Sequence, residues 1–121
     1  TFQDVRTVVS FNGKTYDLPY IRDRMIYYGY RLSEVEHIDL LHEGRRRYKE
    51  RLVNCKLQTL ERAICGRGRV EDIPGADIPE AYHNFVRTNN AVEMRDILHH
   101  NALDLVTMVE VVLFMLEGRT L

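Results

Sequence analysis

The residues best suited to catalysis are a histidine and an aspartate in the segment "HHNALD", residues 99–104. On a regular helix His100 and Asp104, four positions apart, point in nearly the same direction, about 40° apart around the axis. His99 and Asp104 are five positions apart, or about 140°, so their side chains diverge unless the helix is broken. The spacing therefore favours His100 as the partner of Asp104. An ordinary surface ion pair is the alternative interpretation.

A second acidic residue, Asp17, follows an apolar segment in "FNGKTYDLP", residues 11–19. The Asn-Gly pair alone predicts a surface turn or hairpin. A carboxylate just past the end of a strand, at the start of a helix, lies where α/β proteins commonly build functional sites. Asp17 is therefore a candidate site residue, with helix capping as the alternative role.

Basic residues are concentrated between these acidic positions. The chain has a formal net charge of -1, but residues 43–69 carry nine Lys or Arg and three Glu, a net charge of +6. This basic segment is either a solvated helix face or a surface for nucleic-acid phosphates. Carboxylates that hold magnesium, with a basic surface nearby, are what cleavage of a phosphodiester backbone requires. The densest part consists of Arg45, Arg46, Arg47, Lys49 and Arg51.

Composition indicates one globular domain, or a piece of one, because 121 residues with 45% hydrophobic content can form one core. Cys55 and Cys65 are the only cysteines, too few for a zinc site or a disulfide framework, so we expect a cytoplasmic protein. The longest apolar run lies within residues 103–116 and is interrupted by Asp104, Thr107 and Glu110. We therefore expect no membrane-spanning segment.

Hydrophobic patterning predicts an α/β fold dominated by helices. Strands are expected at 5–11 and 35–42, and helices at 18–28, 43–53, 56–65, 80–88 and 91–117. The last helix is the clearest, because Asn90 can cap its start and Gly118 can end it. Its apolar stripe is predicted to be buried and to form the spine of the core: Met94, Ile97, Leu98, Leu105, Met108, Val109 and Val112.

Six segments, in this order, resemble the ribonuclease H-like domain of the YprB family: "FNGKTYDLP", "HIDLLH", "RRRYKERL", "KLQTLERAICG", "DIPGADIPEAY" and "HHNALDLVTM". These proteins are predicted 3'-5' exonucleases of the group called DEDD after its four carboxylates. The resemblance covers nearly the whole chain. It implies that residues 1–121 form the C-terminal portion of one such domain, acting on DNA or RNA at single strands or 3' ends.

The resemblance also implies roles for the acidic residues. Asp17 belongs to the family's second motif and Asp104 to its third, and both would be metal ligands. His100, also in the third motif, would activate or position the attacking water. His99 remains an alternative because one branch of the superfamily places its His five positions before the Asp. Asp39 resembles a recurrent acidic residue on a central strand and is interpreted as structural or as supporting the site from outside it.

The second motif also includes Asn12 and Tyr16. We expect these two residues, together with Arg45, Arg46, Arg47, Lys49 and Arg51, to contact nucleic acid. A complete site of this group holds two Mg²⁺ or Mn²⁺ ions about 4 Å apart, bound by hard oxygen ligands. The family's first motif, Asp-x-Glu on the opening strand, does not occur among the 121 residues. We therefore expect an N-terminally truncated, incomplete ribonuclease H-like domain that lacks its opening antiparallel strands and is inactive in isolation.

Two other functions remain open on the residues alone. The first is a non-catalytic nucleic-acid-binding or protein-interaction module on the same fold. The second is a homo-oligomer that associates through exposed strand edges, since an unpaired edge can pair with another chain.

Overall fold

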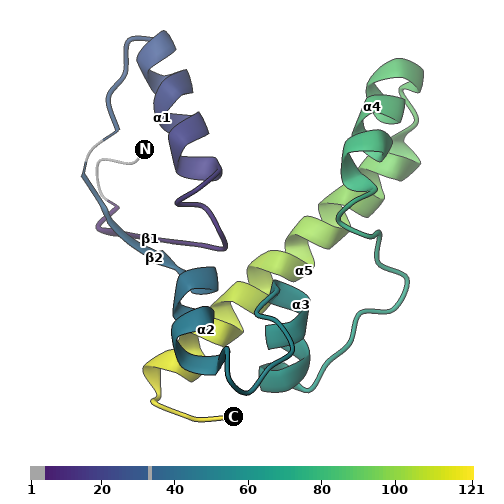
Figure 1. Ribbon diagram of the computed structural model, residues 1–121. Helices are drawn as coiled ribbons and strands as arrows, with labels where there is room; N and C mark the ends of the chain where they lie inside the picture. The colour runs from purple at the N-terminus through teal and green to yellow at the C-terminus, as the bar shows by residue number, and fades with distance from the viewer. Residues whose placement is uncertain (1–4, 33) are drawn as a thin grey trace.

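A computed structural model describes residues 5–32 and 34–121 of the chain (Figure 1). Its fold is α/β and mostly helical, with two strands and a long C-terminal helix, as predicted from the sequence. The elements follow in the order β1 (Thr7–Ser10), α1 (Asp17–Tyr27), β2 (Glu36–Asp39), α2 (Leu40–Tyr48), α3 (Leu57–Leu60), the π-helical turn η2 (Glu61–Cys65), α4 (Ile78–Thr88) and α5 (Ala91–Leu116).

The two strands pair in parallel, with Thr7 opposite Glu36 and Ser10 opposite Asp39. Parallel strands need a long crossover between them, and α1 lies within this one. The Asn-Gly pair therefore forms no hairpin. Asn12 instead adopts a left-handed backbone conformation, with φ of 64°, which Asn tolerates better than most residues. The resulting turn directs the chain from the end of β1 into α1.

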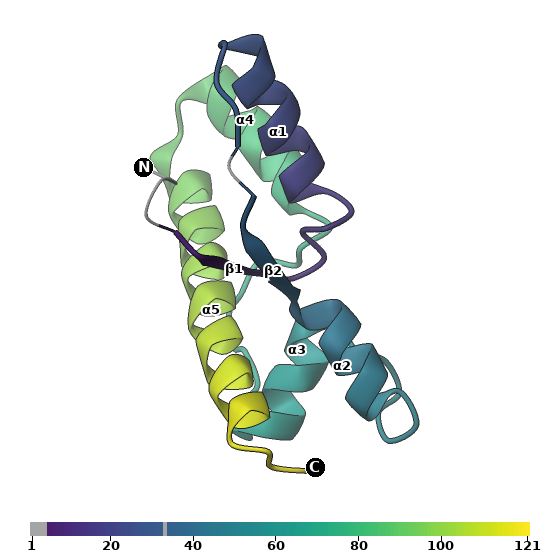
Figure 2. The ribbon, with the colours of Figure 1, turned by 90° about the vertical axis from the view of Figure 1, so that its left-hand side faces the viewer.

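Helix α5 is the spine of the molecule. In Figure 1, α4 folds back along the N-terminal half of α5, while α2 and α3 lie beside its C-terminal half. Figure 2 shows β1 crossing in front of the middle of α5, with β2 beside it. The buried core cluster joins α2, α3 and α5 and consists of Leu40, Tyr48, Leu60, Val111 and Met115.

The start of α5 is as predicted, because the Asn90 side chain accepts a hydrogen bond of 3.2 Å from the backbone N–H of Val92. The prediction of its buried face was wrong in part. Leu98, Leu105 and Val109 are 59%, 55% and 59% exposed. The buried residues of α5 are His100, Thr107, Val111 and Met115. The inner side of the helix is thus partly polar, because it meets charged groups carried by η2 and the loop that follows.

The predicted strand 35–42 ends earlier than expected, and α2 begins at Leu40. The cause is Asp39, which caps α2 by accepting a hydrogen bond of 3.1 Å from the Leu41 N–H. Asp39 also accepts from the N–H groups of Asn12 and Lys14, at 2.9 and 3.1 Å. Burial opposes its charge, but these three amides outweigh that effect and hold the pKa of Asp39 below its usual value. Asp39 therefore has a structural role: it holds the turn before α1.

The expectation that polar interruptions exclude a membrane span was too strict. By length and composition alone, α5 is long and apolar enough to cross a bilayer. In this structure the same helix packs against α4, η2, α3 and α2.

Replacing Gly13 by Ala is expected to destabilise the fold by about 1–3 kcal/mol, the usual cost of overpacking. A Cβ at Gly13 would clash with Ser10 Oγ and would lie 3.3 Å from Asp17 Oδ2, so the turn would have to shift. Urea denaturation measures the change. Gly75→Ala is the matched control, because nothing lies within 4 Å of its added Cβ, and we expect a change below about 0.5 kcal/mol. Equal effects of the two substitutions would contradict the prediction.

Candidate active site

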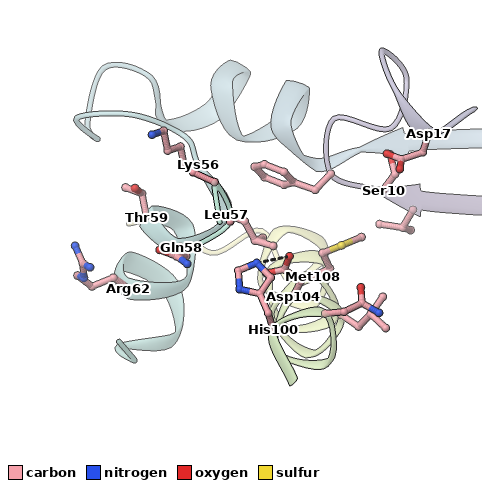
Figure 3. A pocket seen from close by; sticks show the side chains of 16 residues that line it. Ser10, Asp17, Lys56, Leu57, Gln58, Thr59, Arg62, His100, Asp104 and Met108 are labelled. Atoms are coloured by element: carbon pink, nitrogen blue, oxygen red, sulfur yellow. Dashed lines mark ion pairs between the residues drawn. The ribbon is translucent and has the colours of Figure 1, made fainter. Parts of the chain in front are cut away.

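A cavity of about 700 Å³ lies between the end of β1, α3 and the middle of α5. Asp17, His100 and Asp104 all line it, so the structure brings together the three residues predicted to be catalytic. Figure 3 shows Asp17 on the β1 side of the cavity and the His100–Asp104 pair on α5. The remaining polar side chains of the lining are Ser10, Lys56, Gln58, Thr59, Arg62 and Asn101.

Asp17 is the first residue of α1, whose N-cap is Tyr16. In the described part of the chain, no side-chain hydrogen bond caps this helix, so the capping interpretation of Asp17 is not supported. The turn before it is closed by a 2.9 Å hydrogen bond from Leu18 N–H to the Gly13 carbonyl. The Asp17 carboxylate is therefore placed at the cavity by the turn that Asp39 holds.

His100 is buried and contacts carboxylates through both ring nitrogens. Its Nδ1 lies 2.9 Å from Asp72 Oδ2, and its Nε2 lies 3.5 Å from Asp104 Oδ2. A carboxylate oxygen only accepts hydrogen bonds, so the geometry assigns a proton to Nδ1, which donates a hydrogen bond to Asp72. Nε2 is then the nitrogen on the Asp104 side. His99 is exposed and does not line the cavity, so the structure brings His100 and not His99 to Asp17 and Asp104.

A buried network of ion pairs supports His100 and Asp104. Arg69, with a side chain only 5% exposed, lies 2.7 Å from Glu61, 3.1 Å from Asp72 and 2.7 Å from Asp104. Burial disfavours its charge, but the carboxylates, Asp104 first, outweigh burial and raise the pKa of Arg69. Arg69 thus links Asp72, the hydrogen-bond partner of His100, to Asp104.

Glu61 is the centre of the network, and its side chain is fully buried. It accepts hydrogen bonds from Arg67 at 3.0 Å, Arg69 at 2.7 Å and Thr107 Oγ1 at 2.8 Å. Burial raises the pKa of this carboxyl, but the three donors more than offset that and hold the pKa of Glu61 below its usual range. The network therefore attaches η2 and the loop after it to α5.

Sequence reasoning missed Glu61, Arg69 and Asp72. Arg67 and Arg69 were counted as part of a basic surface, although both form ion pairs within the fold. The available signal was the alternation of charges in "GRGRVED", residues 66–72, directly after a helix. That signal indicates paired charges but does not identify the partners on α5, which lie more than 30 positions away.

The basic residues of α2 and of the turn after it lie away from the cavity, and none of them is among the described residues that line it. This group, here called the α2 cluster, consists of Arg45, Arg46, Arg47, Lys49 and Arg51. Arg46 and Arg47 pair with Glu43, and Lys49 pairs with Glu50. Two side chains of the cluster also donate to backbone carbonyls, Arg47 to that of Met115 and Arg51 to that of Leu121. The cluster's role in binding nucleic acid stays a prediction.

The other two residues predicted to contact nucleic acid, Asn12 and Tyr16, belong to the turn before α1. Asn12 is half-buried and its backbone N–H binds Asp39, while the Tyr16 ring is exposed. Neither lines the cavity within the described residues.

Asp17 and Asp104 offer the oxygen ligands that Mg²⁺ and Mn²⁺ prefer. Across residues 5–32 and 34–121, however, no three His, Cys, Asp or Glu side chains are grouped so that they could hold a metal ion. Asp104 Oδ1 is also bound by Arg69. These residues alone therefore do not fit the predicted site for two metal ions.

Replacing Asp72 by Ala is expected to remove the preference of His100 for one tautomer, because the carboxylate that accepts the hydrogen bond from Nδ1 is lost. Long-range ¹H–¹⁵N correlation spectra of the imidazole rings would show Nδ1-protonated His100 in the wild type and a mixture of tautomers in the variant. His99, one residue away and exposed, serves as the internal control and should not change. A wild-type His100 protonated only on Nε2 would contradict the geometry.

The architecture, with two parallel strands, a crossover helix and a long C-terminal helix, is consistent with an incomplete ribonuclease H-like fold. A family model for the RNase_H superfamily matches residues 1–115. The "Uncharacterized protein YprB" of Bacillus subtilis is 33% identical over an alignment of 119 positions, which covers 93% of this chain but 28% of that protein. No solved structure matches the chain significantly. The match over residues 1–115 shows that the chain belongs to the ribonuclease H superfamily.

Proposed function

We propose that the full-length protein containing this chain is a 3'-5' exonuclease that hydrolyses phosphodiester bonds at single-stranded or 3'-terminal DNA or RNA. The observation that carries the proposal is the convergence of Asp17, His100 and Asp104 on one cavity, from parts of the sequence more than 80 residues apart. Membership of the ribonuclease H superfamily supports a nuclease-type domain.

In this proposal the three site residues have distinct roles. His100 accepts a proton from the attacking water at Nε2, because Asp72 occupies its other nitrogen. Asp17 and Asp104 contribute oxygen atoms to a site that requires Mg²⁺ or Mn²⁺. Since these two carboxylates do not form a metal site by themselves, further carboxylates must come from elsewhere in the full-length protein, and the 121-residue chain alone is inactive.

A second candidate is a non-catalytic, nucleic-acid-binding module on the same fold. The observation in its favour is the 2.7 Å contact between the Arg69 guanidinium and Asp104 Oδ1, which neutralises that carboxylate with a cation from the protein itself.

The test uses the full-length protein with 5'-labelled single-stranded DNA and RNA. With Mg²⁺ or Mn²⁺ we expect products shortened stepwise from the 3' end, and with EDTA no cleavage. An oligonucleotide with a blocked 3' terminus is the control for polarity and should persist. Binding without cleavage in either metal would favour the non-catalytic module. A protein that neither binds nor cleaves the oligonucleotides would contradict both functions.

A further inference from the structure

One wall of the cavity is formed by the helical segment from Lys56 to Arg62, here called the α3 wall. This segment buries Leu57, Leu60 and Glu61 against the rest of the molecule and leaves Lys56 and Arg62 exposed. Both exposed residues line the cavity, together with Gln58 and Thr59. Figure 3 shows these four side chains on one side and Asp17 on the other, with His100 and Asp104 between them.

The position of the α3 wall is fixed relative to the candidate active site. At its start, the Asn54 side chain accepts hydrogen bonds from the Lys56 N–H at 3.0 Å and from Thr59 Oγ1 at 2.7 Å. At its end, Glu61 binds Thr107 of α5 at 2.8 Å. Because α5 also carries His100 and Asp104, the basic side chains start from a backbone that is rigidly tied to the acidic ones.

Lys56 and Arg62 differ in their ion pairing from most other basic residues of the segment 43–69. Among the ion pairs of the described residues, none involves Lys56 or Arg62. Arg67 and Arg69 are occupied by the buried network. Two cations without protein partners at the rim of a cavity attract an anionic ligand there.

We propose that Lys56 and Arg62 bind phosphates of the single strand that occupies this cavity, and that they contribute more to nucleic-acid affinity than the α2 cluster does. This inference rests on the proposed function, because it assigns the substrate contacts of the same site. A cavity of about 700 Å³ has the size of a small-ligand pocket, which suits the end of one strand. The backbone phosphates then contact the α3 wall while the terminal phosphodiester lies near His100.

The test measures binding of a 5'-fluorescein single-stranded oligonucleotide to the full-length protein by anisotropy, in EDTA, over a series of salt concentrations. Each phosphate contact on a single strand adds about 0.7 to the slope of log K against log salt. Lys56→Gln with Arg62→Gln should therefore reduce the slope by about 1.4, which is about 25-fold in affinity at 0.1 M salt. The charge-conserving pair Lys56→Arg with Arg62→Lys should retain most of the slope and shows that the loss is one of charge.

Two further double variants remove the same charge elsewhere. Arg87→Gln with Arg95→Gln, on the outer surfaces of α4 and α5, should leave the slope unchanged. Arg45→Gln with Lys49→Gln tests the α2 cluster, and a reduction equal to or larger than that of the α3 wall variant would overturn the inference. Circular dichroism checks that each variant is folded.

The outcomes separate this inference from the proposed function. If the wild type binds and the α3 wall variant loses slope, the inference stands even when no metal supports cleavage. If the wild type cleaves but the α3 wall variant keeps its slope, the inference alone fails. A wild-type protein that does not bind the oligonucleotide overturns the inference.

Discussion

Replacing Glu61 by Gln is expected to lower the free energy of unfolding by about 3 kcal/mol. The carboxylate is fully buried and lies 3.0 Å from Arg67 and 2.7 Å from Arg69. Removing one partner of a buried ion pair costs about 3–5 kcal/mol because the other charge loses its compensation. The lower end applies here, since Arg67 keeps Glu110 and Arg69 keeps Asp72 and Asp104.

Urea denaturation of the wild type and the variant measures this difference. Glu43→Gln is the matched control, because Glu43 also pairs with two arginines but its side chain is 32% exposed, at the surface of α2. Exposed ion pairs contribute about 0–1 kcal/mol, so the control should be destabilised by less than about 1 kcal/mol. Similar losses for the two variants would show that the Glu61 network contributes no more than a surface pair.

The contribution of Glu61 should also depend on pH in a defined direction. Burial raises its pKa and the hydrogen bonds from Arg67, Arg69 and Thr107 lower it, with a net shift below the usual value of 4.5. A carboxyl whose pKa is lower in the folded state adds stability that is fully present above the unfolded-state pKa. That stability is lost as the pH falls through the folded-state pKa. The difference between wild type and Glu61→Gln should therefore be constant above about pH 5.5 and shrink below 4.5. A difference that grows on acidification would contradict this assignment.

Replacing His100 by Gln in the full-length protein is expected to reduce metal-dependent hydrolysis by about 10²–10⁴-fold, the usual contribution of a general base. His100 lines the cavity, and Asp72 holds its Nδ1 proton, so Nε2 is the nitrogen able to accept a proton from water. Initial rates at low substrate concentration, compared as kcat/KM, give the loss directly.

His99→Gln provides the matched control, because it makes the same change at the neighbouring position of the same helix. His99 is exposed and lies outside the cavity lining, so its variant should stay within about twofold of the wild type. A larger loss for His99→Gln than for His100→Gln would instead favour the five-residue spacing. Because His100 is buried, thermal unfolding of both variants must accompany the rates.

Local patterns were sufficient for most of the elements. The apolar run before Asn12 predicted β1, and the cap at Asn90 predicted where α5 begins. These features depend on residues that are neighbours in the sequence, so they can be predicted from a single sequence. The end of β2 was predicted three residues too late, because Asp39 was assigned to a strand although its side chain caps the following helix.

The inner face of α5 could not be predicted in the same way. Hydrophobicity favoured a stripe that includes Leu105 and Val109, yet both are more than half exposed. Thr107 is buried instead, because its hydroxyl bonds to Glu61, 46 positions earlier in the chain. A hydrogen bond between distant segments has no periodic signature, so neither the polar inner face nor the buried network was visible in the sequence.

By itself, the sequence determined that His100 and Asp104 share one face of a helix, because a four-residue spacing sets the direction of both side chains on any α-helix. It also determined that Asp17 follows a strand and begins a helix. Only the tertiary structure decided that Asp17 lines the same cavity as this pair, that Asp72 holds Nδ1 of His100, and that Lys56 and Arg62 form the basic wall. The reason is that these placements depend on how β1, α3 and the loop at residues 66–77 pack around α5, and long-range packing is set by shape and paired charge.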